Sequence, residues 1–199
     1  MGMLRLRQWA AALGWLIMVD CYLRPSELTE MAPQQVLPRD LRANMRKVAL
    51  VLNPGYAGKY SKTGEIDERV LVMREWLYPL IERYAALRQN QSRLWPFNLK
   101  QLRSIFLAAA KETGILALKP VLYMARHPGP SIDRYNNTLP LSDVAKRGRW
   151  RSKSSLARYE KRAMLQDTWQ ALSAGAQAYC LRAEAALLGV LHRSLPRTA

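Results

Sequence analysis

Residues 23–28 of the chain are Leu23-Arg24-Pro25-Ser26-Glu27-Leu28, and they join two segments of helical composition. The first segment runs from about Leu4 to Leu23. Pro25 suits the first turn of a second helix, because proline at the first helical position has a helical φ and gives up only an N–H that would lack a helical partner. The pattern therefore predicts a helix-to-helix junction at Arg24, with Glu27 one helical turn further on.

Two short runs of β-branched and apolar residues follow this junction, Lys47–Leu52 and Arg69–Met73. Turn-forming residues lie between them, namely Asn53, Pro54, Gly55, Gly58 and Gly64. Such runs bounded by turn residues predict two strands of a small antiparallel sheet. The loop that connects the strands is long and carries two lysines, Lys59 and Lys62.

The remainder of the chain has a mainly helical pattern. It predicts helices over Trp76–Arg88 and Leu99–Thr113, the second ended by Gly114. After the Lys119-Pro120 break, the prolines that follow Arg126 allow a helix to begin there but not to pass through.

Three further helices are predicted near the carboxyl end. Ser142 suits the N-cap of a short helix over Asp143–Lys146, ended by Gly148, and Ser152 suits the cap of a helix that carries Tyr159. Met164–Leu191 is a long amphipathic pattern rich in Ala and Leu. With 199 residues, 49% of them hydrophobic, we expect one α+β domain that is mainly α.

The chain is strongly basic. It has 31 Lys and Arg against 15 Asp and Glu, a formal net charge of +16. The charges extend from Arg5 to Arg197 and do not form one tail, which favours a folded basic surface over a disordered arm. Such a surface indicates a polyanionic partner, nucleic acid first of all, with a merely soluble basic protein as the alternative.

Composition argues against several other classes of site. Cys21, Cys180, His127 and His192 are the only cysteines and histidines, so no spacing matches a zinc site or a disulfide framework. The apolar stretch Trp9–Val19 is too short to span a membrane, and no small-residue cleavage site follows it. We therefore predict a buried helix there, no membrane partner and a reducing, intracellular location.

Three separated segments resemble the active-site motifs of the tyrosine recombinase, or phage integrase, family. Leu23–Leu28 resembles the first arginine motif, and Tyr123-Met124-Ala125-Arg126-His127 resembles the second. Arg147-Gly148-Arg149-Trp150 is followed by Ser155-Leu156-Ala157-Arg158-Tyr159, with Tyr159 nine positions after Trp150 as in the family. The resemblance covers about residues 9–165, and the Arg-Gly-Arg-Trp form is similar to integrases of eukaryotic mobile elements.

The resemblance implies a recombinase catalytic domain over residues 1–163 that recombines or integrates double-stranded DNA site-specifically. Tyr159 would be the nucleophile that forms a 3′-phosphotyrosyl intermediate. Arg24, Arg126 and Trp150 would bind the scissile phosphate, because catalysis of phosphoryl transfer depends on donors around the nonbridging oxygens. Glu27 would hold the Arg24 guanidinium in place.

Supporting and DNA-contacting roles follow from the same resemblance. Tyr123 stands where the family more often has His, so its role would be positional. His127 would support the site or cap the adjoining helix. Arg147 and Arg149 would contact DNA, as would Lys59 in the loop between the strands.

The family places a catalytic lysine on the hairpin, where it protonates the departing 5′ oxygen. Lys62 in Ser61-Lys62-Thr63-Gly64 is the predicted acid, and Lys59 stays open as the alternative. Gly55-Tyr56-Ala57-Gly58-Lys59 is not a nucleotide-binding phosphate loop, since its glycines are too close together and Tyr60 replaces the Ser or Thr. Because the phosphotyrosyl ester retains the bond energy, we expect no nucleotide, metal or other cofactor.

Residues 164–199 are predicted to form a C-terminal helix and tail. In relatives this segment packs against a neighbouring subunit, so it either exchanges between subunits of a homotetramer on DNA or folds back on its own domain. Relatives also carry a core-binding domain before the catalytic one, so the chain is either a fragment or a minimal form. The expected location is the nucleus or a bacterial nucleoid.

Three alternatives to a recombinase stay open. A metal-dependent nuclease would use Glu65, Asp67 and Glu68, although these residues suit a solvated turn better. A decayed integrase-like domain that only binds DNA is favoured by Tyr123 and by the absent amino-terminal domain. A type IB topoisomerase uses similar chemistry, but the motif spacing resembles recombinases more closely.

Overall fold

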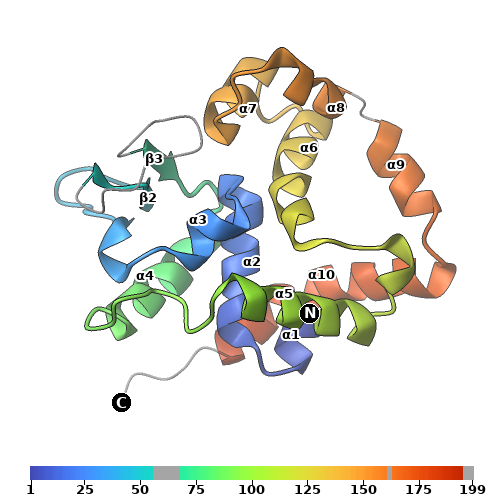
Figure 1. The fold of residues 1–199 in the computed structure, drawn as a ribbon, viewed down its shortest axis with the longest axis horizontal. Helices are drawn as coiled ribbons and strands as arrows, with labels where there is room; N and C mark the ends of the chain where they lie inside the picture. Colours follow the sequence, from blue (N-terminus) through green and yellow to red (C-terminus); the bar gives the residue numbers. More distant parts are fainter. Residues whose placement is uncertain (56–67, 161–162, 195–199) are drawn as a thin grey trace.

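The computed structural model describes residues 1–55, 68–160 and 163–194, and these form a mainly helical fold with one small sheet (Figure 1). The helices are α1 Gly2–Arg5, α2 Trp9–Cys21, α3 Pro25–Thr29, α4 Tyr78–Leu87, α5 Leu99–Glu112, α6 Pro128–Tyr135, α7 Leu141–Gly148, α8 Ala157–Glu160, α9 Ala163–Gln170 and α10 Ala174–Ser194. Short 3-10 helices are η1 Pro33–Gln35, η3 Glu75–Leu77, η4 Leu116–Leu118, η5 Leu122–Arg126 and η6 Lys153–Ser155. The expected α+β, mainly α class is confirmed.

Helix α2 runs through the middle of the fold (Figure 1). It is apolar around most of its circumference, and its Leu13, Ile17 and Met18 are fully buried, as expected for a helix with neighbours on every side. The predicted buried helix over Trp9–Val19 is therefore confirmed. Tyr22 ends α2 in the left-handed region, at φ 53°, and this turns the chain sharply into Arg24.

The sheet has three antiparallel strands in the order β1 Val36–Leu37, β2 Ala49–Leu52 and β3 Glu68–Leu71. Leu50 of β2 pairs with Val36 on one side and Val70 on the other. The two predicted strands are confirmed: β2 begins two residues later than predicted, and β3 begins one residue earlier and ends two residues earlier. The short edge strand β1 is an addition. Strands β2 and β3 bring Leu50, Leu52 and Val70 into the same core as α2.

Several predicted helix limits are right and others are wrong. Pro25 is the first residue of α3, and α5 ends one residue before the predicted limit. The segment from Leu4 to Leu23 is divided, because Arg7 adopts φ 57° between α1 and α2. Helix α7 begins at Leu141 after Pro140, so Ser142 is inside it and is not its N-cap.

The carboxyl-terminal segment is two helices, α9 and α10, so the single helix predicted over Met164–Leu191 is wrong. Ser173 caps the second helix, since its Oγ accepts a hydrogen bond from the Ala176 N–H at 3.2 Å. Helix α10 then folds back across its own domain, where it contacts α1 and buries Leu191 (Figure 1). No described helix is both long enough and apolar enough to cross a membrane.

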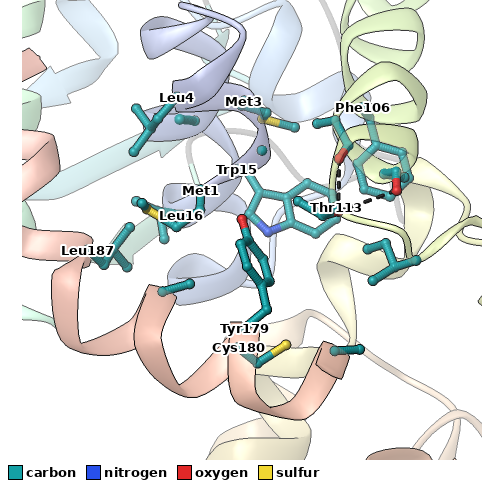
Figure 2. A pocket seen from close by; sticks show the side chains of 17 residues that line it. Met1, Met3, Leu4, Trp15, Leu16, Phe106, Thr113, Tyr179, Cys180 and Leu187 are labelled. Atoms are coloured by element: carbon teal, nitrogen blue, oxygen red, sulfur yellow. Dashed lines mark hydrogen bonds between the residues drawn. The ribbon is translucent and has the colours of Figure 1, made fainter. Parts of the chain in front are cut away.

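An apolar hollow of about 320 Å³ lies where α10 meets α1, α2 and α5 (Figure 2). Trp15 and Phe106 stack in its wall with ring centroids 4.8 Å apart, and Tyr179 of α10 lies beside them (Figure 2). The return of α10 therefore leaves a packing gap at this contact.

Candidate active site

Arg24 and Glu27 form a cap at the start of α3. The Arg24 backbone N–H donates to Glu27 Oε2 at 2.6 Å, and its guanidinium Nη1 donates to Oε1 at 2.6 Å. This satisfies one N–H that the helix itself leaves without a partner. The carboxylate thus fixes both the backbone and the guanidinium of Arg24, as the one-turn spacing predicts.

Glu27 is shared by three guanidinium groups from distant parts of the chain. Besides Arg24, Arg149 Nη2 donates to Oε2 at 2.7 Å, and Arg126 Nη1 lies 3.7 Å from the same oxygen. Arg149 also lies 3.6 Å from Glu68 of β3. With three cations around two carboxylates, this cluster carries an excess of positive charge.

Arg126 is the most deeply buried member of the cluster, with no exposed surface. Its Nη2 donates to the carbonyl oxygen of Gly148, and its guanidinium carbon lies 4.9 Å from the centre of the Trp150 ring. Burial first, and then the charges of Arg149 and Arg24, lower its pKa to about 10, so it still carries its charge at neutral pH.

Two guanidinium nitrogens of Arg126 donate no hydrogen bond to any residue that the structure describes. Its Nε and Nη1 have no hydrogen-bond partner among the residues that the structure describes, and the same holds for Nε of Arg149. A buried charged donor without a hydrogen bond costs free energy, so such groups usually have a ligand or a structural partner. The cluster therefore has the charge and the free donors to bind an anion.

The segment from Arg147 to Trp150 reverses the chain beside this cluster. Gly148 ends α7, and Arg149 follows in the left-handed region at φ 56°. The Trp150 ring lies against Gly148 so closely that a side chain there would overlap it. Trp150 thereby lies between the Arg126 guanidinium and the ring of Tyr159, whose centroid is 5.0 Å from that of Trp150.

Tyr159 is on the short helix α8 and is 3% exposed. Its hydroxyl is 2.7 Å from Nδ1 of His127, the residue immediately before α6. Tyr123 packs its ring edge to face against His127, with centroids 5.4 Å apart, and remains 48% exposed. The phenol oxygen is thus next to an imidazole nitrogen, and the Trp150 ring alone lies between the Tyr159 ring and the Arg126 guanidinium.

The structure brings together most residues of the three motifs: Arg24, Glu27, Arg126, His127, Trp150 and Tyr159. Lys59 and Lys62, and likewise Glu65 and Asp67, lie outside the described residues. Glu68 begins β3, and its side chain is 12% exposed and faces Arg149, which differs from a solvated turn residue. Among the described residues, no three His, Cys, Asp or Glu side chains gather as a metal site would require.

Arg147 and Arg149, which the resemblance predicts to contact DNA, have little exposed side-chain surface. Their side chains are 10% and 6% exposed. Arg147 Nη2 donates to the Asp20 carbonyl oxygen at 2.7 Å, and its guanidinium lies over the Tyr22 ring. The protein itself engages both guanidinium groups.

Asp20 is the residue that sequence reasoning missed. Its buried carboxylate accepts from the Met73 N–H at 2.8 Å and pairs with Arg74 at 2.7 Å, and its Oδ2 is 3.4 Å from Arg147. It ties the end of α2 to the segment after β3 and to α7. The available signal is a lone acid within the apolar run Trp9–Cys21, since a buried carboxylate needs a partner.

A groove of about 420 Å³ opens beside Arg24. Arg24 and Arg103 of α5 contribute its charged wall, and Val121, Leu122 and Tyr123 contribute an apolar and aromatic wall. This groove gives solvent access to the Arg24 side of the cluster, in contrast to the buried side at Arg126.

No protein-family model, no curated protein and no solved structure matches this chain.

Proposed function

We propose that the chain is a DNA strand-exchange enzyme of the tyrosine recombinase type, with Tyr159 as its nucleophile. The proposal is supported by one observation. Arg126 in the cationic cluster has guanidinium nitrogens with no hydrogen-bond partner among the described residues. The Trp150 ring alone lies between this guanidinium and the Tyr159 phenol, which is hydrogen-bonded to His127. A nucleophile, a proton acceptor and anion-binding donors are what phosphodiester transfer needs.

The proposed reaction assigns each of these groups a role. The Tyr159 oxygen attacks the phosphorus of a DNA phosphodiester while its proton passes to His127, and the bond to the 5′ oxygen breaks. Arg24 and Arg126 donate to the nonbridging oxygens, and the Trp150 indole N–H adds a further donor. The departing 5′ oxygen takes a proton from an acid, for which Lys62 is our choice and Lys59 the alternative. Attack by a 5′ hydroxyl on the phosphotyrosine then rejoins a strand.

Access to the phosphate requires a rearrangement of α8. Tyr159 and Arg126 are both buried in the free protein, whereas a scissile phosphate must contact both. The described part of α8 is the single turn Ala157–Glu160, and the Tyr159 hydroxyl ties this turn to His127. Its displacement by DNA would expose the unused donors of Arg126 without unfolding the core.

The same burial favours a second candidate, a domain that binds DNA and no longer cleaves it. In that case the phenol and the imidazole stabilise the fold, and the net charge of +16 provides salt-sensitive DNA binding. Assembly as a homotetramer on DNA, with α10 exchanged between subunits, belongs to the recombinase proposal alone.

The test is covalent capture on DNA. The protein is incubated with a pool of nicked duplexes of randomised sequence, which trap a 3′-phosphotyrosyl adduct, and the products are separated under denaturing conditions. We expect an adduct from the wild type and from Tyr135→Phe, an exposed tyrosine of α6, and none from Tyr159→Phe. Salt-sensitive binding without an adduct would instead select the binding-only domain.

A further inference from the structure

We propose that Arg147 and Arg149 act as an internal clamp that positions Arg126 and Trp150 for reaction at Tyr159, and that neither contacts DNA. The inference rests on the proposed function. It assigns positioning roles to two arginines that the basic composition alone would place on a DNA-binding surface.

The backbone at Arg149 is in the left-handed region, at φ 56°. This conformation is strained for a non-glycine residue, and glycine could hold the position without that strain. The arginine side chain compensates through three hydrogen bonds: to Glu27 Oε2 at 2.7 Å, to the Arg147 carbonyl at 3.0 Å and to the Tyr22 carbonyl at 3.3 Å. All three partners belong to the protein, so this guanidinium serves a contact within the fold.

The two arginines attach the turn to two different helices. Arg147 joins the turn to the Asp20 carbonyl at the end of α2, and Arg149 joins it to Glu27 in α3. Gly148 lies between them, and its carbonyl accepts the hydrogen bond from Arg126 while its open face receives the Trp150 ring. The two ion-paired side chains therefore fix the peptide on which Arg126 and Trp150 both depend.

Arg149 and Arg126 compete for the Glu27 carboxylate. Arg149 occupies Glu27 Oε2 at 2.7 Å, whereas Arg126 Nη1 lies 3.7 Å from the same oxygen. If Arg149 were removed, Glu27 would be free to pair closely with Arg126, and that pairing would take up the donor that an anion needs. By pairing with Glu27, Arg149 thus keeps this carboxylate from neutralising Arg126, and Arg126 stays available for an anionic ligand.

The experiment compares Arg149→Ala, Arg149→Lys and Arg147→Ala with the wild type. Arg39→Ala is the control for stability alone, because Arg39 forms an equally short ion pair with Glu82, at 2.7 Å, on the β1–α4 side of the fold. Circular dichroism first establishes that each variant is folded. If Arg149→Ala does not fold, Arg149→Lys takes its place, because it keeps the positive charge and loses the planar guanidinium. Three quantities are then measured.

The salt dependence of binding to a non-specific duplex separates a clamp from a DNA contact. A side chain that neutralises one phosphate contributes about 0.9 to the slope of log affinity against log salt. Non-specific binding leaves α8 in place and Arg126 buried, so Arg126 adds no phosphate contact to this slope. We expect Arg149→Ala and Arg147→Ala to keep the wild-type slope within experimental error. A slope lowered by about 0.9 in either variant would overturn the clamp, whether or not the protein cleaves DNA.

The adduct rate at saturating DNA tests positioning. We expect Arg149→Ala to lower this single-turnover rate at least tenfold with little change in the half-saturating DNA concentration, Arg149→Lys to recover part of it, and Arg39→Ala to keep the wild-type rate at a lower melting temperature. A wild-type rate in folded Arg149→Ala would contradict the clamp.

Inorganic phosphate gives a readout that needs no cleavage. We expect millimolar phosphate to raise the melting temperature of the wild type and of Arg39→Ala, and to raise that of Arg149→Ala by much less, because Glu27 then competes for Arg126. If the wild type forms no adduct, the proposed function fails, and the clamp is still decided by the phosphate effect and the salt slope. Equal stabilisation of wild type and Arg149→Ala by phosphate would contradict it.

Discussion

Nδ1 of His127 is 2.7 Å from the Tyr159 hydroxyl, although 32 positions separate the two residues in the chain. The contact joins the start of α6 to the short helix α8 through the phenol oxygen itself. One hydrogen bond therefore both places the proposed nucleophile beside a base and keeps it buried in the free protein. This relationship makes His127 the first residue to test.

His127→Ala should lower the rate of adduct formation about 10²-fold or more, since a positioned general base typically contributes 10²–10⁴-fold. DNA affinity should stay close to the wild-type value, because His127 faces the phenol and provides no phosphate contact in the scheme. The matched control is His192→Ala, which removes the other histidine of the chain, in α10. Equal rates for the two variants would remove His127 from the mechanism.

Arg126→Met should slow cleavage strongly without unfolding the protein. Glu27 would still be paired with Arg24 at 2.6 Å and Arg149 at 2.7 Å, so no buried carboxylate is left without a cation. The variant also removes a buried charge with unused donors, and replacing such groups by an apolar chain of similar volume is often neutral or stabilising. We expect a free energy of unfolding at or above that of the wild type in urea titration, and an adduct rate lower by about 10²–10³. Marked destabilisation would mean that Arg126 is a structural residue.

The local part of the site could be predicted from sequence, because it depends on spacing within one turn. Arg24 and Glu27 are three positions apart across a helix start, so their mutual contact follows from helix geometry. The partner of Arg149 could not be predicted in this way, since Glu27 is 122 positions away. Nothing in the local sequence around an arginine indicates which acidic residue will be its ion-pair partner. Basic residues of this kind suggest DNA contacts until the fold shows where they lie.

The fold, like the site, could be predicted from the sequence only where local residues determine it. Pro25 marks the start of α3, and the apolar run of α2 marks the core. The break between α9 and α10 falls at Ala171, Leu172 and Ser173, which include neither proline nor glycine, so no local breaker indicates it. Such a break is determined by the return of α10 onto α1, a contact between the two ends of the described chain.

Gly148→Ala tests whether the turn must lie against Trp150. An added methyl group would overlap the Trp150 ring, and a ring packed between Arg126 and Tyr159 has little room to retreat. We expect about 1–3 kcal/mol of destabilisation, as for other overpacked sites, together with a loss of adduct formation. Gly175→Ala is the matched control, because nothing lies within 4 Å of the added methyl group and α10 gains a better helix former. Its unfolding midpoint should be unchanged or slightly raised, so a similar loss in both variants would contradict the role of Trp150.

Alkaline pH should destabilise the fold through Tyr22. Burial raises the pKa of the Tyr22 phenol above its usual value of 10, and the hydrogen bond that it donates to Asp133 raises it further. The unfolded chain therefore loses this proton from about pH 10 upward while the folded protein retains it. The stability that Tyr22 contributes is thus complete below pH 10 and decreases as the pH rises above that value.

Urea unfolding at pH 8 and at pH 10.5 measures the change. Tyr22→Phe cannot ionise at this position, so it should lose less stability between the two pH values than the wild type does. The exposed Tyr135→Phe should follow the wild type, and an equal pH dependence in Tyr22→Phe would show that Tyr22 does not titrate differently in the folded and unfolded states.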